Sequence, residues 1–130
     1  MDLGLKDKVV IITGATGGIG RIMLEAFAAE GAIAICASRN VAVGREIAEA
    51  ANKKGFPGKI IAIACDITDR DSVNKMVEEV HKSAGIVSVL VNNAGGASSA
   101  GDFSDLTDEA RLSDVALNIT GATFCIQALA

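Results

Sequence analysis

The sequence predicts an α/β fold in which a parallel β-sheet carries helices on both faces. Apolar runs of strand length recur along the chain, segments with helical spacing of apolar residues lie between them, and several of these segments end at a glycine. Nearly continuous apolar runs are typical of strands that are covered on both faces, as in parallel sheets. The 130 residues, half of them hydrophobic, are enough for a single domain with its own core.

The four expected strands contain no charged residue. They are residues 9–12, 32–37, 60–64 and 87–91. Right-handed crossovers through the intervening helices would bring these strands into one twisted sheet, whose ligand crevice opens at the carboxyl ends of the strands. We therefore expect any site to lie just after each strand.

The intervening segments place apolar residues every three or four positions, on one face of a helix. The clearest series is Val73, Met76, Val77 and Val80. The expected helix ends are Gly31, Gly55 and Gly85, where glycine can adopt the left-handed conformation that closes a last turn. For the helix starts, Asn40 is the expected cap of the second helix, and Thr68 with Asp71 is the expected capping box of the third.

Composition excludes some classes of partner and site. The formal net charge of −4 argues against nucleic acid and against anionic membranes, because both attract basic surfaces. Apolar runs are interrupted by glycine and charge, so we expect no membrane span. Cys36, Cys65 and Cys125 are widely spaced within apolar runs, which favours reduced, buried thiols over a disulfide frame or a metal site. We expect a cytoplasmic protein without a bound metal.

A glycine-rich string, Thr13-Gly14-Ala15-Thr16-Gly17-Gly18-Ile19-Gly20, follows the first strand and leads into a helix. A pyrophosphate needs bare backbone N–H groups at a positive helix N-terminus, and side chains would block its approach. An ordinary tight turn would also use glycine. Four glycines within seven residues favour the phosphate-binding interpretation.

The second strand ends in Ser38-Arg39-Asn40, about twenty residues after the glycine loop, where a dinucleotide fold contacts the adenosine ribose. A carboxylate there would bind a 2′-hydroxyl, but no Asp or Glu lies between Gly31 and Arg45. Arg39 could instead bind a 2′-phosphate through charge-assisted hydrogen bonds. NADP(H) is therefore favoured over NAD(H), the alternative being that Arg39 is only a solvated loop charge.

The third and fourth strands also run into polar residues. Asp66 could accept a hydrogen bond from an adenine amino group, or could simply satisfy backbone groups at the start of the next helix. Because Thr68 is the expected cap, we favour the adenine role. Asn92 and Asn93 end the fourth strand, where their amides could tie neighbouring strands together, although the string could also be a simple turn.

Taken together, the string from Thr13 to Gly20, Asp66, and Asn92-Asn93-Ala94-Gly95 resemble the ordered signature of the short-chain dehydrogenase/reductase family, and the resemblance extends over essentially the whole chain. It implies a Rossmann-type doubly wound sheet with strand order 3-2-1-4. The implied contacts are Gly14, Thr16, Gly17, Gly18, Ile19 and Gly20 with the phosphates, Asp66 and Ile67 with adenine, and Asn93, Ala94 and Gly95 with the ribose and nicotinamide. Asn92 would steady the sheet, and Asn118 would be the catalytic asparagine that holds a water in a proton relay.

Members of this family transfer a hydride between nicotinamide and a carbonyl or alcohol, using a serine, a tyrosine and a lysine that follow this region. The chain contains no tyrosine, and Ser98 and Ser99 come too early to replace the serine, so we interpret them as loop residues. The chain also ends inside an apolar helical segment, residues 119–130. We therefore expect residues 1–130 to be one NAD(P)-binding domain, incomplete at its C-terminus and inactive alone.

Three hypotheses follow for the function. The first is that the parent protein is an NADP(H)-preferring oxidoreductase for a small carbonyl or alcohol, assembled as a homodimer or homotetramer. The second is that the chain is a non-catalytic dinucleotide-binding module, and the third is that it is an inactive remnant. The substrate itself cannot be predicted, because fold alone does not name one.

Overall fold

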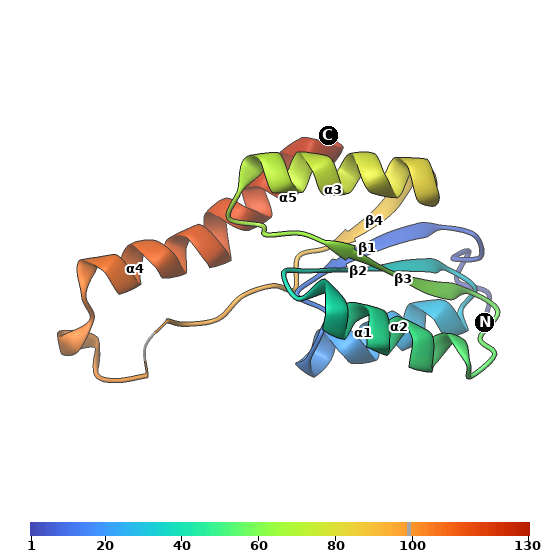
Figure 1. Ribbon diagram of the computed structural model, residues 1–130, viewed down its shortest axis with the longest axis horizontal. Helices are drawn as coiled ribbons and strands as arrows, with labels where there is room; N and C mark the ends of the chain where they lie inside the picture. The colour runs from blue at the N-terminus through green and yellow to red at the C-terminus, as the bar shows by residue number, and fades with distance from the viewer. Residues whose placement is uncertain (99) are drawn as a thin grey trace.

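The computed structural model, which describes residues 1–98 and 100–130, contains one four-stranded parallel sheet in the order β3-β2-β1-β4 (Figure 1). The strands are β1 (Val9–Thr13), β2 (Ile33–Ser38), β3 (Lys59–Ala64) and β4 (Val87–Val91). Each strand end lies within one residue of its expected position. The predicted fold class and strand order are confirmed.

The helices alternate with the strands as expected. They are α1 (Gly18–Ala29), α2 (Val41–Asn52), α3 (Arg70–Ser83), α4 (Asp108–Val115) and α5 (Gly121–Leu129), with a short 3₁₀ turn, η1 (Phe103–Asp105), ahead of α4. A π-helical segment, Ala116–Thr120, joins α4 to α5. The chain from Asp108 to Leu129 is thus one long helix, and Figure 1 shows its α4 end projecting beyond the sheet.

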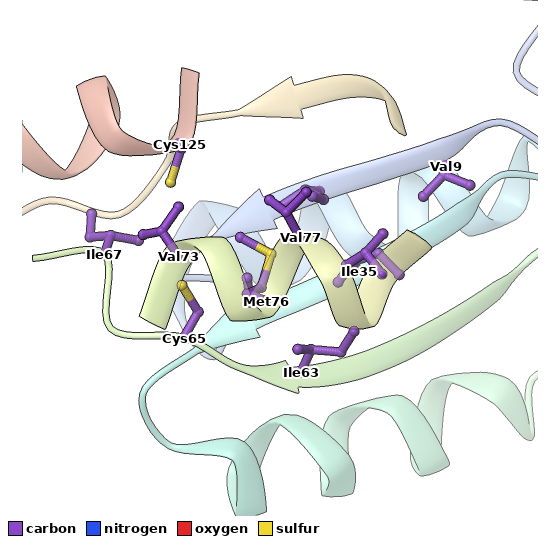
Figure 2. Packing of buried hydrophobic residues seen from close by; sticks show 12 residues of the cluster. Val9, Ile35, Ile63, Cys65, Ile67, Val73, Met76, Val77 and Cys125 are labelled. Carbon is purple, nitrogen blue, oxygen red and sulfur yellow. The ribbon is translucent and has the colours of Figure 1, made fainter. Parts of the chain in front are cut away.

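Two apolar layers hold the helices on the sheet. Val10, Ile12 and Cys36 pack on one face with residues of α1 and α2. Their neighbours Val9, Ile11 and Ile35 point to the other face and pack with α3 and α5 (Figure 2). Side chains alternate between the faces of a strand, so strands with few polar residues produce a core on each side.

The cysteines are free and buried, in agreement with the sequence analysis. Burial raises the pKa of the Cys36 thiol to about 11 and that of the Cys65 thiol to about 12. Burial likewise raises the pKa of the Cys125 thiol. These thiols stay protonated at neutral pH, as expected for cysteines that serve packing rather than reactivity.

By length and composition alone, the helix Asp108–Leu129 could cross a membrane, and 11% of its most apolar window is buried. A core helix of a water-soluble protein can meet the same two criteria. The absence of a membrane span therefore remains a prediction.

One side chain of α2, that of Asn52, is hydrogen-bonded to the backbone of the edge strand β3. The Asn52 amide accepts a hydrogen bond from the backbone N–H of Ile60 at 2.9 Å and donates one to the Ile60 carbonyl at 2.9 Å. This pair of bonds fixes the C-terminal end of α2 relative to the start of β3.

The helix ends agree with the sequence analysis. Gly31, Gly55 and Gly85 follow their helices with φ of 85°, 77° and 109°. Of the predicted N-caps, Asn40 is confirmed, because its side chain accepts a hydrogen bond from the N–H of Val43.

The predicted capping box at Thr68 is wrong. Asp69 caps α3, with its carboxylate accepting hydrogen bonds from the N–H groups of Asp71 and Ser72. The Thr68 hydroxyl donates instead to Asp66 at 2.7 Å. A charged carboxylate one residue nearer the helix is the better acceptor for its positive N-terminus.

We expect Asp69→Ala to lower the free energy of unfolding by about 1 kcal/mol, the usual cost of losing an N-cap. Thr68→Val, which keeps the shape of the side chain, should cost less. Urea denaturation of both variants measures the difference, and a larger loss for Thr68→Val would restore Thr68 as the cap.

Candidate functional site

A cavity of about 490 Å³ lies at the carboxyl ends of the strands, where the sequence places the site. This volume is within the range of small-molecule sites, roughly 300–1,000 Å³. Residues following each of the four strands contribute to its wall. The wall consists of Gly14, Thr16, Gly17, Gly18, Ile19, Ala37, Ser38, Arg39, Cys65, Asp66, Ile67, Thr68, Asn93, Ala94, Gly95 and Leu117.

The glycine loop joins β1 to α1 and leaves space above the helix start. Gly14 and Gly18 have φ of 61° and 55°, which side chains rarely tolerate. A Cβ on Gly17 or Gly18 would meet no heavy atom within 4 Å. The N-cap of α1 makes no side-chain hydrogen bond and the first turn has no acidic residue. An anion can therefore approach the free N–H groups of α1, as the phosphates of a dinucleotide require.

Ser38 and Arg39 lie at the end of β2, beside the glycine loop. The Ser38 hydroxyl accepts a hydrogen bond from the N–H of Asn40 at 3.2 Å and donates to the Thr16 hydroxyl at 3.5 Å. These contacts link the turn after β2 to the loop after β1. Arg39 is exposed on the cavity wall, where its guanidinium can bind an anionic ligand.

Asp66 follows β3, the strand next to the one that Arg39 follows. Its Oδ1 accepts hydrogen bonds from the Thr68 hydroxyl at 2.7 Å and the Thr68 N–H at 3.0 Å. These bonds, aided by the charge of Arg39, hold the pKa of Asp66 below its ordinary value. Asp66 thus does satisfy nearby backbone, the alternative role that its sequence position allows, but among the described residues no donor reaches its Oδ2. One carboxylate oxygen remains available to a ligand.

Asn93 ties β4 to β1. Its side-chain amide donates to the carbonyls of Thr13 at 3.0 Å and Gly14 at 3.2 Å. The family resemblance implies this steadying role for Asn92, and for Asn92 the expectation is wrong. Among the described residues, the side-chain bonds between the two strand ends belong to Asn93 and Thr13.

Gly20 and Asn118 were also predicted as site residues, but neither contributes to the cavity wall. A Cβ on Gly20 would lie 2.5 Å from the Asn93 amide nitrogen and 2.8 Å from Cα of Ala15. Gly20 is therefore required for the close packing of α1 under the loop. Its contact with the phosphates stays a prediction.

Asn118 uses its side chain to hold the segment after β4. Its Oδ1 accepts a hydrogen bond from the N–H of Gly96 at 3.1 Å, and its Nδ2 donates to the Gly96 carbonyl at 2.7 Å. The same nitrogen donates to the Asp114 carbonyl, four residues earlier, at 2.9 Å. The relay role of Asn118 remains a prediction, but its position beside the cavity is fixed by these bonds.

The helix widens at Asn118. In the π-helical segment the N–H of Gly121 donates to the Ala116 carbonyl, five residues back instead of four. An asparagine that bonds the carbonyl four residues earlier competes with the regular helical ladder. π-bulges are frequent at functional sites, and Leu117 of this one lies in the cavity wall.

Several wall residues were not predicted, among them Leu117 and Thr68. Thr68 follows Asp66 closely and could have been found from its place after a strand. Leu117 comes from a helix distant in sequence, and its apolar side chain carries no local signal. Ser98 lies in a loop as predicted, and Ser99 lies outside the described residues.

Within residues 1–98 and 100–130, no group of three or more His, Cys, Asp or Glu side chains is placed to hold a metal ion.

The family model described as short chain dehydrogenase matches residues 8–130, nearly the whole chain. The chain belongs to the short-chain dehydrogenase/reductase family. The family's signature motifs thus occur in their expected order, as the glycine loop after β1, Asp66 after β3 and Asn93 after β4.

Individual relatives agree with this assignment. The chain is 30% identical over 119 residues to a 3beta-hydroxysteroid dehydrogenase of Mediterraneibacter gnavus, covering 92% of this chain and 42% of the relative. It is 38% identical over 128 residues to an L-rhamnose 1-dehydrogenase (NAD(P)(+)) of Azotobacter vinelandii, covering 97% and 50%. The chain spans about half the length of these curated relatives.

A solved structure is similar in fold as well as in sequence. L-sorbose reductase from Gluconobacter frateurii, complexed with NADPH and L-sorbose, superimposes with a TM-score of 0.89 at 33% identity. The match covers 99% of this chain and 48% of that chain. The sheet order and helix placement are thus those of a family member crystallised with a dinucleotide.

We expect Gly14→Ala to destabilise the protein more than Gly18→Ala. Both positions have positive φ, which costs about 1–2 kcal/mol for a residue with a Cβ. Only at Gly14 does the added Cβ collide with backbone, at 2.7 Å from Cα of Ala94. Thermal unfolding of the two variants measures this, and equal losses would mean that the contact between the glycine loop and Ala94 is not tight in solution.

Proposed function

We propose that the whole protein is an NADP(H)-preferring oxidoreductase that transfers a hydride between nicotinamide and the carbonyl or alcohol group of a small molecule. The observation that carries this proposal is that one cavity is lined by the ends of all four strands and includes the family's cofactor motifs. The present chain would be the cofactor-binding half.

Each part of the cavity has a role in this proposal. The loop from Gly14 to Ile19 and the N-terminus of α1 bind the phosphates through backbone N–H groups. Asp66 accepts a hydrogen bond from the adenine amino group through Oδ2, and Ile67 packs against the ring. Arg39 and Ser38 bind the 2′-phosphate of the adenosine ribose. Asn93, Ala94 and Gly95 form the wall beside the second ribose and the nicotinamide.

The cofactor would supply the hydride for reduction of a carbonyl and accept it in oxidation of an alcohol, and the protein would hold the reacting groups and move the proton. Asn118 would position a water that carries this proton, because it lies beside the cavity at the widened turn of the helix. The chain contains no tyrosine. In the proposal, the acid/base tyrosine with its lysine and serine therefore belongs to a part of the whole protein outside residues 1–130, and the chain alone is inactive.

Assembly and location are further parts of the proposal. Four large apolar residues are exposed on the long helix with the spacing of helix pairing, namely Leu112 (58%), Val115 (40%), Ile119 (61%) and Ile126 (56%). We propose that this stripe is covered in a homodimer or homotetramer.

Three free, buried cysteines fit a reducing compartment, so we propose a cytoplasmic location.

The cofactor preference predicts a specific effect of Arg39. Arg39→Ala should raise the Kd for NADPH about ten- to a hundredfold, because a charge-assisted bond of about 1.5–3 kcal/mol is lost. The Kd for NADH should stay nearly unchanged. Titrations followed by the shift of the thermal midpoint measure both, since a ligand of the folded form raises that midpoint.

Arg45→Ala is the matched control, because Arg45 is an exposed arginine on α2 that does not line the cavity. It should leave both Kd values unchanged. If Arg39→Ala weakened NADPH and NADH equally, the 2′-phosphate would not be its ligand and the preference would be assigned wrongly.

The activity is tested by turnover of the whole protein with a substrate panel. The panel contains a 3-ketosteroid and L-sorbose with NADPH, and L-rhamnose and meso-2,3-butanediol with NADP⁺, after the names of relatives, which include a meso-2,3-butanediol dehydrogenase of Serratia marcescens. We expect at least one compound to be turned over at about 1 per second or faster, as is usual for enzymes. NADPH absorbance provides the measurement.

Gly17→Val is the control for this assay. Gly17 has an extended backbone with φ of −154°, and a Cβ there would meet no heavy atom within 4 Å, so the variant should fold. Its side chain would fill the space reserved for phosphate and abolish turnover. A wild-type protein that binds NADPH but converts none of the panel would favour the non-catalytic binding module instead.

A further inference from the structure

The long helix Asp108–Leu129 turns one face toward the rest of the molecule. The residues on this face are polar in the first half of the helix and small and buried in the second half. Gly121 and Cys125 on this face are buried. Asn118 and Asp114 precede them at helical spacing and bond the segment that follows β4. The polar half of the face is therefore where the helix meets that segment.

Asp114 binds the backbone of Ser98. Its Oδ1 accepts a hydrogen bond from the N–H of Ser98 at 2.7 Å. The Ser98 hydroxyl donates to the Ala110 carbonyl, one turn earlier on the helix, at 3.2 Å. A carboxylate that accepts from a backbone N–H makes a short bond, roughly twice as strong as one between neutral groups. Ser98 is thus fastened to the helix at two points.

The segment of residues 95–98 continues directly from the cavity wall. Gly95 lines the cavity, and Gly96 is paired with the Asn118 amide. Asn118 therefore holds the end of the segment nearer the cavity, and Asp114, one helical turn away, holds the far end. With both bonds made, the backbone beyond Gly95 has a defined course alongside the long helix.

We propose that Asp114 is a positioning residue for the substrate. By holding Ser98, it fixes the course of residues 95–98 and thereby the position of Gly95, which lines the cavity where a small carbonyl or alcohol would be held. This inference rests on the proposed function, since this part of the cavity holds a substrate only if the nicotinamide lies beside Asn93, Ala94 and Gly95. Asp114 itself does not touch the cofactor in this proposal.

The first test measures the bond itself by hydrogen exchange of the Ser98 amide in the whole protein. Asp114→Ala should speed this exchange about fivefold or more, because the amide loses its acceptor. Asp114→Asn, which keeps an acceptor oxygen without charge, should give an intermediate rate. Asp108→Ala is the matched control, since Asp108 is on the same helix with a side chain 92% exposed and pairs with Arg111. It should leave the rate unchanged.

The second test measures the consequence for the reaction, with the panel compound that the wild-type protein converts best. Asp114→Ala should raise KM about five- to tenfold while kcat falls less, because uniform substrate binding is weakened. The Kd for NADPH and the thermal midpoint should change little, which separates positioning from a loss of folding. Asp114→Asn should recover part of the KM.

The outcomes separate this inference from the proposed function. Faster exchange at Ser98 together with a raised KM supports it. Unchanged exchange, or faster exchange with an unchanged KM, overturns it. A wild-type protein that binds no dinucleotide overturns the proposed function and with it the substrate role of Asp114, whereas the exchange measurement still decides whether Asp114 holds Ser98.

Discussion

A group of hydrogen bonds centred on the buried Thr13 fixes the ends of β1 and β4 relative to each other. Thr13 is 1% exposed, and its hydroxyl accepts hydrogen bonds from the N–H groups of Asn93 and Ala94 at 3.1 and 3.0 Å. The Asn93 amide returns two bonds to the carbonyls of Thr13 and Gly14. Buried polar groups must be paired, and these are paired only when the two strand ends lie in one relative position. The phosphate-binding loop and the wall after β4 are thus positioned together.

Much of this arrangement could be predicted from the sequence. The strands were found to within one residue because both faces of the sheet are covered, which leaves long runs with few polar residues. The left-handed glycines after α1, α2 and α3 were found because a helix end has few alternatives to glycine at positive φ. Parallel strands then bring their carboxyl ends to one edge, so Asp66 and Asn93 could be assigned to the same site as the glycine loop.

The errors occurred where two neighbouring residues could play the same part. Thr68 and Asp69 can both cap a helix, and the outcome depended on the competing bond from Thr68 to Asp66. Asn92 and Asn93 are equivalent in sequence, but successive side chains of an extended chain point to opposite sides. The bond that the Ser98 N–H donates to Asp114 depends on a tertiary contact, for which no local pattern exists.

The side chain of Asn52 has a consequence for how the sheet can be extended. By making both a donor and an acceptor bond to Ile60, its amide occupies backbone positions that an incoming strand would use. A foreign strand at β3 would have to displace it, and unprotected edges are where sheets of different molecules join. Addition of a further strand to this edge of the sheet is therefore hindered at Ile60.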